Sequence, residues 1–192
     1  MLDTYGRKYI KKFTIKLANF LKEKNFKPNH LTFLSLIIGI ISAFMFYLKF
    51  DYLSIIFLWL SGLCDVLDGT LARITKKSSN LGMVLDIFFD RLVEGFILVS
   101  IALRLPNYQI NIIILFFAIL MSMTIFLISG SIIKKESEKS FYYQAGLMER
   151  TEGFILISLI IIFKNPILIN VFSFLIIITI YQRFKEIVKY IN

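Results

Sequence analysis

The sequence contains two stretches, residues 31–48 and 110–133, in which no side chain is charged. A helix needs about 20 apolar residues to cross the hydrocarbon core of a bilayer, so runs of this length constrain the fold more than any other feature. Hydrophobic residues make up 57% of the chain and charged residues only 18%. One soluble core of this size could not bury so many apolar side chains. The sequence therefore predicts an all-α integral membrane protein.

Polar or proline-containing breaks divide the rest of the chain into further apolar runs. Each run is expected to form a helix that spans the membrane. The six predicted transmembrane helices cover residues 31–48, 52–73, 81–103, 110–133, 147–163 and 167–182. Together with their connections they predict one six-helix membrane domain at residues 28–192.

The first 27 residues differ from the rest because they carry eight Lys or Arg and no long apolar run. Apolar residues recur there at three- and four-residue intervals, at Ile10, Phe13, Leu17, Phe20 and Leu21. This pattern predicts an amphipathic helix within residues 1–27 that lies on the membrane surface, with its lysines toward anionic headgroups.

Positive charges alternate along the predicted topology. They gather before the first span, after the second and fourth, and in the tail, whereas the other connections hold one each, namely Lys49, Arg104 and Lys164. This positive-inside pattern predicts a multi-pass plasma-membrane protein with both termini cytoplasmic. It also accounts for the net charge of +9 without nucleic acid, whose binders concentrate basic residues on one face.

Four aspartates interrupt two of the apolar runs. Asp65 and Asp68 lie three residues apart and Asp86 and Asp90 four apart, so each pair shares one face of its helix. The short connection between the helices brings both pairs to the same, cytoplasmic end. Carboxylates inside membrane helices are costly and indicate a functional site. Oxygen ligands suit Mg²⁺, Mn²⁺ or Ca²⁺, and a site shared with phosphate favours Mg²⁺.

Small residues accompany these carboxylates. Gly69 and Ala72 on one helix and Gly82 on the other remove bulk beside the aspartates, so a large anionic substrate could approach the backbone. Arg73 offers a guanidinium fork for a phosphate. Close helix packing through small residues is the alternative explanation for each glycine or alanine taken alone.

Residues 65–90 read D-x2-D-G-x2-A-R-x8-G-x3-D-x3-D. This pattern resembles the signature of the CDP-alcohol phosphatidyltransferase family, and the resemblance extends to the length, the six spans and the N-terminal surface helix. It implies transfer of a phosphatidyl or similar group from a CDP-linked lipid to a small alcohol, with release of CMP. It also implies a homodimer.

The resemblance further implies roles for individual residues. Two divalent ions, Mg²⁺ or Mn²⁺, are expected among Asp65, Asp68, Asp86 and Asp90, with Asp90 also the general base. Contacts to the CDP moiety are expected from Asn29, Thr32, Gly69, Arg73 and Ser79. Asn29 and Thr32 belong to a P-N-x-x-T element that would also make an ordinary helix start.

The acceptor alcohol is indicated by residues 129–153, which resemble the corresponding part of phosphatidylinositol-phosphate and archaetidylinositol-phosphate synthases. Lys134 and Arg150 would then bind the phosphate of inositol phosphate. Glu136 and Gly153 stand where that pattern has arginine, so glycerol phosphate, serine or another polyol stays open as acceptor.

Two other classes of membrane protein also use intramembrane carboxylates. A Mg²⁺-dependent prenyltransferase binds a diphosphate through aspartates, but its Asp-rich motifs usually lie far apart in a longer chain. A small ion transporter would place its charges near the bilayer midplane on broken helices, whereas these aspartates gather toward one surface.

Overall fold

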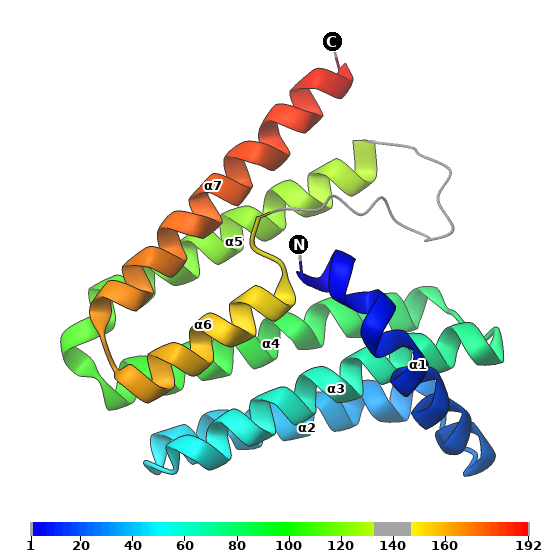
Figure 1. Cartoon of the computed structure of the whole chain (residues 1–192). Coiled ribbons are helices and arrows are strands. Elements are labelled where there is room, and N and C mark those ends of the chain that lie inside the picture. Colours follow the sequence, from blue (N-terminus) through cyan, green and yellow to red (C-terminus); the bar gives the residue numbers. More distant parts are fainter. Residues whose placement is uncertain (1, 133–146, 192) are drawn as a thin grey trace. The chain divides into compact units, whose positions relative to one another are not determined.

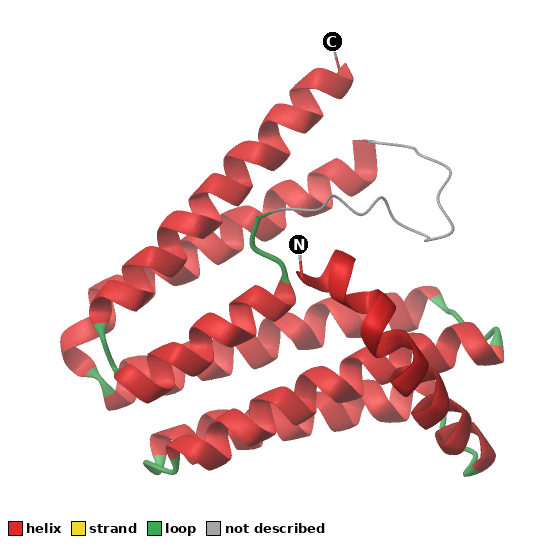
Figure 2. Ribbon diagram, viewed as in Figure 1, coloured by secondary structure: helices red, strands yellow, loops and turns green. Residues whose placement is uncertain are grey.

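The computed structural model describes residues 2–132 and 147–191, with side chains from residue 11 onward, and within them it contains helices and no strand (Figures 1 and 2). The all-α prediction is therefore confirmed. The elements in chain order are α1 (Leu2–Glu23), α2 (Pro28–Tyr47), α3 (Asp51–Thr75), α4 (Asn80–Arg104), the 3₁₀ turn η1 (Pro106–Tyr108), α5 (Gln109–Ile132), α6 (Arg150–Phe163) and α7 (Pro166–Ile191).

The helix boundaries follow from local chemistry. Pro28 and Pro166 each occupy the first residue of a helix, where the missing N–H costs nothing and the fixed φ favours helix. Lys49, Lys76 and Lys164 stand just past the ends of α2, α3 and α6 with φ between 47° and 71°, the left-handed conformation that ends a helix. The breaks predicted near these residues are confirmed.

Among the described residues, four helical segments are long and apolar enough to cross a membrane: Pro28–Tyr47, Asp51–Thr75, Pro106–Ile132, which joins η1 and α5, and Pro166–Ile191. The chain is therefore a multi-pass membrane protein. The helix α4 falls short because of its charged residues, and α6 because its 14 residues are fewer than the roughly 20 that a span needs. The count of six spans stays a prediction.

Residues 6–106 form one compact unit, in which α2 packs along both α3 and α4. Paired hydroxyls hold α2 to α3 without leaving polar groups unsatisfied: Ser35 Oγ donates to the Ser61 carbonyl at 2.9 Å, and Ser42 Oγ donates to the Ser54 carbonyl at 2.7 Å. At Gly39 a Cβ would lie 2.4 Å from Val93, so only glycine allows α4 to approach α2 there.

The helix α1 contacts α2 and α3 through one side. Its fully buried Ala18 joins Leu31, Leu67 and Leu71 in one hydrophobic cluster. Phe13 and Phe20, which the sequence also placed on the apolar face, are exposed. The two phenylalanines and the exposed lysines around them remain the part of α1 available to a membrane surface.

Near the C-terminal end of α2, one arginine side chain of α4 contacts residues of both α2 and α3. Arg104 Nη1, in the last turn of α4, donates to the Phe46 carbonyl at 2.8 Å and pairs with the Asp51 carboxylate. Its guanidinium also lies 4.3 Å from the centroid of the Phe46 ring. This group of Phe46, Asp51 and Arg104 is called the arginine end below. The sequence analysis had counted Arg104 only as a lone charge in a connection.

Of the described residues, 2–5, 107–132 and 147–191 form the second compact unit, in which α7 packs against α5 and α6. Helix α7 continues to Ile191, beyond the span expected to end at residue 182. Arg183, which had been assigned to a tail, is consequently buried at 9% exposure and donates to the Ser122 carbonyl and hydroxyl at 3.0 Å. The spacing of buried Thr179, Arg183 and Ile187 is the signal that the helix continues.

Candidate metal and nucleotide site

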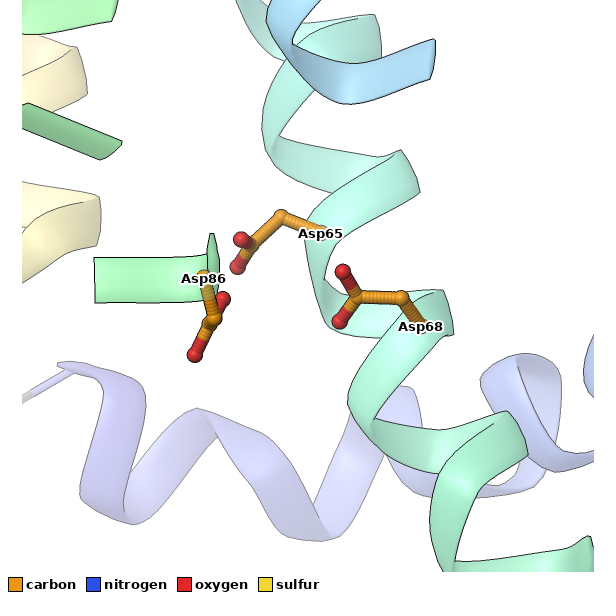
Figure 3. A group of neighbouring side chains, drawn as sticks. All are labelled: Asp65, Asp68 and Asp86. Carbon is orange, nitrogen blue, oxygen red and sulfur yellow. The ribbon is translucent and has the colours of Figure 1, made fainter. Parts of the chain in front are cut away.

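Three of the four predicted aspartates meet between α3 and α4. Carboxylate oxygens of Asp65, Asp68 and Asp86 all lie within 4.8 Å of one another. Figure 3 shows Asp65 and Asp68 projecting from α3 toward Asp86, which comes from α4. Asp68 is buried and the other two are half-buried. These three residues, with Thr32 described below, are called the acidic end.

The fourth aspartate, Asp90, lies one turn after Asp86 on α4 and is half-buried. It is not among the three carboxylates that the structure brings together. Its predicted roles as a metal ligand and as the general base therefore stay predictions.

Three carboxylates this close repel one another strongly in a poorly solvated place. A bound divalent cation relieves that repulsion, and hard oxygen donors suit Mg²⁺ or Mn²⁺ rather than a soft metal. The residues thus fit the metal site that the sequence predicted.

A residue of α2 contacts this group directly. Thr32 Oγ1 donates a hydrogen bond of 2.5 Å to Asp68 Oδ2, and both residues are buried. The predicted contact of Thr32 with the nucleotide stays a prediction. The hydrogen bond to a candidate metal ligand joins residues 36 positions apart, and no local sequence pattern reveals it.

Asn29, Ser79 and Gly82, for which the sequence predicted a role at the site, lie close together at the start of α4. Ser79 is the N-cap of α4, and its hydroxyl accepts a 3.0 Å hydrogen bond from the Gly82 N–H. A Cβ on Gly82 would lie 3.1 Å from Ser79 Oγ and 3.6 Å from Asn29 Oδ1. Asn29, Ser79 and Gly82 are therefore neighbours, and the tightest contact of a Cβ at Gly82 would be with the capping hydroxyl of Ser79.

Gly69 and Arg73 lie on α3 one turn apart, directly after Asp68. A Cβ on Gly69 would meet only Arg73 Nη1, at 3.6 Å, so protein packing does not require glycine at this position. Arg73 is exposed, and its Nη2 donates to Thr70 Oγ1 at 3.2 Å. The predicted contacts of Gly69 and Arg73 with a phosphate-bearing ligand stay predictions.

Two charged residues of α4 whose roles the sequence left open pair with each other. Arg91 Nη1 lies 2.5 Å from Glu94 Oε2, and the two side chains are 34% and 18% exposed. This i,i+3 pair follows Asp90 directly and keeps two charges together inside an apolar helix.

Lys134, one of the two predicted acceptor residues, lies outside the described residues. Arg150, the other, belongs to the second compact unit. Arg150 begins α6, with its guanidinium 5.4 Å from the centroid of the Phe154 ring. Arg183 adds a buried cation to this unit that the sequence analysis did not single out.

A multi-pass helical protein with a carboxylate cluster for divalent cations, and with an arginine and an open glycine beside it, has the features of a membrane enzyme that handles phosphate groups. Residues 25–184 match the family described as CDP-alcohol phosphatidyltransferase. The chain belongs to this family, and it is a transferase of phospholipid biosynthesis.

One relative is the archaetidylinositol phosphate synthase of Pyrococcus horikoshii, which is 32% identical over 91% of this chain and 90% of its own length. Two solved structures of Mycobacterium tuberculosis phosphatidylinositol phosphate synthase share the fold. The one with CDP-DAG bound has a TM-score of 0.73 at 20% identity and covers 91% of this chain and 92% of its own. The one in complex with manganese and citrate has a TM-score of 0.72 at 19% identity, covering 90% and 87%.

Proposed function

We propose that this enzyme transfers a phosphatidyl or archaetidyl group from a CDP-linked lipid to inositol phosphate, with release of CMP. The observation that carries the proposal is the meeting of Asp65, Asp68 and Asp86 within 4.8 Å, in a chain that belongs to a family acting on CDP-alcohols. Family membership favours this chemistry over the prenyltransferase and the ion transporter.

Asp65, Asp68 and Asp86 would hold divalent cations, with Asp90 completing a two-ion site. Bound Mg²⁺ or Mn²⁺ neutralises a pyrophosphate and stabilises charge on a departing phosphate. The manganese in the related mycobacterial structure supports this choice of metal. The protein contributes fixed carboxylates on two rigid helices, one of them tied to α2 through Thr32.

Asp90 is proposed as the general base. Asp90 lies one turn after Asp86 on α4. From there it would take the proton of the incoming hydroxyl as that oxygen attacks the β-phosphorus. An aspartate is a weak base, so its contribution comes as much from position as from basicity.

The nucleotide would lie along the surface formed by Gly69, Arg73, Asn29 and Ser79. The open Cβ direction at Gly69 supports a close approach to the backbone, and the exposed guanidinium of Arg73 suits a phosphate. Asn29 and Ser79 already share one place at the start of α4.

Inositol phosphate is proposed as acceptor because both named relatives make inositol phosphate lipids and because Lys134 and Arg150 match that branch. Glu136 and Gly153 are departures from its pattern, so glycerol phosphate, serine and other polyols are the competing acceptors. We further propose a homodimer with both termini and the site at the cytoplasmic face, and residues 1–27 as a membrane-surface segment.

An acceptor screen tests the proposal. The purified full chain receives Mg²⁺ and either CDP-diacylglycerol or CDP-archaeol, with inositol 1-phosphate, inositol, glycerol 3-phosphate or serine supplied separately, and CMP is measured. CMP release that requires inositol 1-phosphate is expected. Release with serine or glycerol 3-phosphate alone would reverse the acceptor assignment, and no Mg²⁺-dependent release with any acceptor would refute the proposed reaction.

A further inference from the structure

The hydrogen bond from Thr32 to Asp68 links α2 to the acidic end across 36 residues. Thr32 is 4% and Asp68 6% exposed, so little water competes for either group. A buried carboxylate needs hydrogen-bond donors, because burial without them is costly. Thr32 supplies one.

The Thr32 hydroxyl has a single proton and two acceptors in reach. The Pro28 carbonyl lies 3.2 Å away and Asp68 Oδ2 lies 2.5 Å away. The shorter distance and the negative charge favour the carboxylate, since hydroxyl-to-carboxylate bonds of about 2.5–2.7 Å are among the strong ones. The proton is therefore committed to Asp68.

We infer that Thr32 is a positioning residue for Asp68: its hydroxyl holds the carboxylate in the orientation that brings it to Asp65 and Asp86, and so raises the affinity of the site for a divalent cation. This inference rests on the proposed cation site. It gives Thr32 a different task from donating a hydrogen bond to the nucleotide, because its only donor is used on Asp68.

The other buried hydroxyls of α2 do not have this arrangement. Ser35 and Ser42 both donate to backbone carbonyls of α3, at Ser61 and Ser54, and have no hydrogen bond to a carboxylate. Ser42 lies toward the arginine end, far along α2 from Thr32. Ser42→Ala therefore removes a buried hydroxyl between the same two helices and serves as the matched control.

The test measures Mn²⁺ affinity of the purified full chain, from the electron paramagnetic resonance signal of unbound Mn²⁺. Thr32→Val keeps the shape and removes the hydroxyl, and should weaken binding by about 10–100-fold, as loss of outer partners of metal ligands does. Thr32→Ser should restore most of the affinity. Ser42→Ala should bind like the wild type, even if its thermal midpoint falls.

A kinetic readout separates positioning from nucleotide contact. Thr32→Val should raise the Mg²⁺ concentration that gives half-maximal CMP release, while KM for the CDP-lipid at saturating Mg²⁺ stays near the wild-type value. A raised KM with unchanged metal affinity would overturn the inference in favour of nucleotide contact. Equal metal affinity in Thr32→Val and Ser42→Ala would overturn it as well, as would a wild type that binds no Mn²⁺.

If Thr32→Val does not accumulate as folded protein, Thr32→Cys is compared with Thr32→Ser, because a thiol is a weaker donor than a hydroxyl. Several-fold weaker Mn²⁺ binding by the cysteine variant is then expected, and equal binding would overturn the inference. A wild type that binds Mn²⁺ but releases no CMP refutes the proposed reaction alone, since the affinity comparison still decides the role of Thr32.

Discussion

The compact unit of residues 6–106 holds charged groups at both of its ends, and the two groups differ in their charges. At the arginine end, Arg104 brings a positive charge to the Asp51 carboxylate and the Phe46 carbonyl, so the chain supplies both signs of charge. At the acidic end, three carboxylates from α3 and α4 lie within 4.8 Å of one another. Like charges are brought together there at a cost that a bound cation offsets.

The difference teaches which polar cluster serves the fold and which serves chemistry. A completed ion pair with a cation–π contact stabilises helix ends in the absence of any ligand. A cluster of carboxylates destabilises the same helix bundle until a cation binds. The presence of such a cluster in an apolar sequence therefore indicates a function. Substitution of a charged residue at the arginine end should therefore lower stability and keep activity. Substitution of an aspartate at the acidic end should lower activity and keep stability.

The largest effect is expected from Asp90→Asn. It should lower turnover by about 10²–10⁴-fold, the usual contribution of a general base, while CDP-lipid binding is retained. Steady-state CMP release and a lipid-binding assay measure the two. Asp51→Asn makes the same chemical change at the arginine end and should keep turnover per folded protein. Near-wild-type activity of Asp90→Asn would show that the base lies elsewhere.

Asp86→Asn should follow, with activity lowered by more than about 100-fold at fixed Mg²⁺, because a direct ligand matters more than its outer partners. In a chelator the same variant should melt no lower than the wild type, since one of three repelling charges is gone. Thermal denaturation with and without Mg²⁺ checks this. A clearly lower midpoint for Asp86→Asn in chelator would contradict the like-charge account of the acidic end.

Arg104→Gln should destabilise the protein by about 2–3 kcal/mol, somewhat less than the loss of a fully buried ion pair, since Arg104 and Asp51 are 13% and 21% exposed. The thermal midpoint should drop by several degrees, with turnover per folded protein kept. Lys49→Gln removes an exposed positive charge close by in sequence and should change little. Equal thermal midpoints for Arg104→Gln and Lys49→Gln would show that the arginine end does not stabilise the fold.

The smallest effect should come from two glycines whose Cβ directions are open. Gly69→Ala and Gly95→Ala should each raise stability by up to about 1 kcal/mol through helix propensity. Gly69→Ala should also weaken CDP-lipid binding, whereas Gly95→Ala should not, because only Gly69 lies beside Asp68 and Arg73. Identical lipid affinity in the two variants would place the nucleotide away from Gly69.

The sequence was sufficient for the features that depend on local spacing. Proline and lysine breaks marked the helix boundaries, and the i,i+3 spacing of Asp65 and Asp68 placed both on the face that meets Asp86. The gathering of three of the four aspartates was predictable because each helix period fixes which face a residue occupies.

Contacts between distant residues were not predictable, because no helix period encodes them. The Thr32–Asp68 bond, the approach of Val93 to Gly39 and the Arg104–Asp51 pair each depend on how α2 packs against α3 and α4. The apolar pattern of α1 likewise did not distinguish the face that packs on Leu67 and Leu71 from Phe13 and Phe20, which stay exposed.

The unit that holds the acidic end is continuous in the chain, from residue 6 to residue 106. During synthesis, domains generally fold as units beginning at the N-terminus. We therefore expect the carboxylates and Thr32 to assemble in the nascent chain before the helices that follow have left the ribosome, so that a cation could aid insertion of the first half of the enzyme as well as its later chemistry.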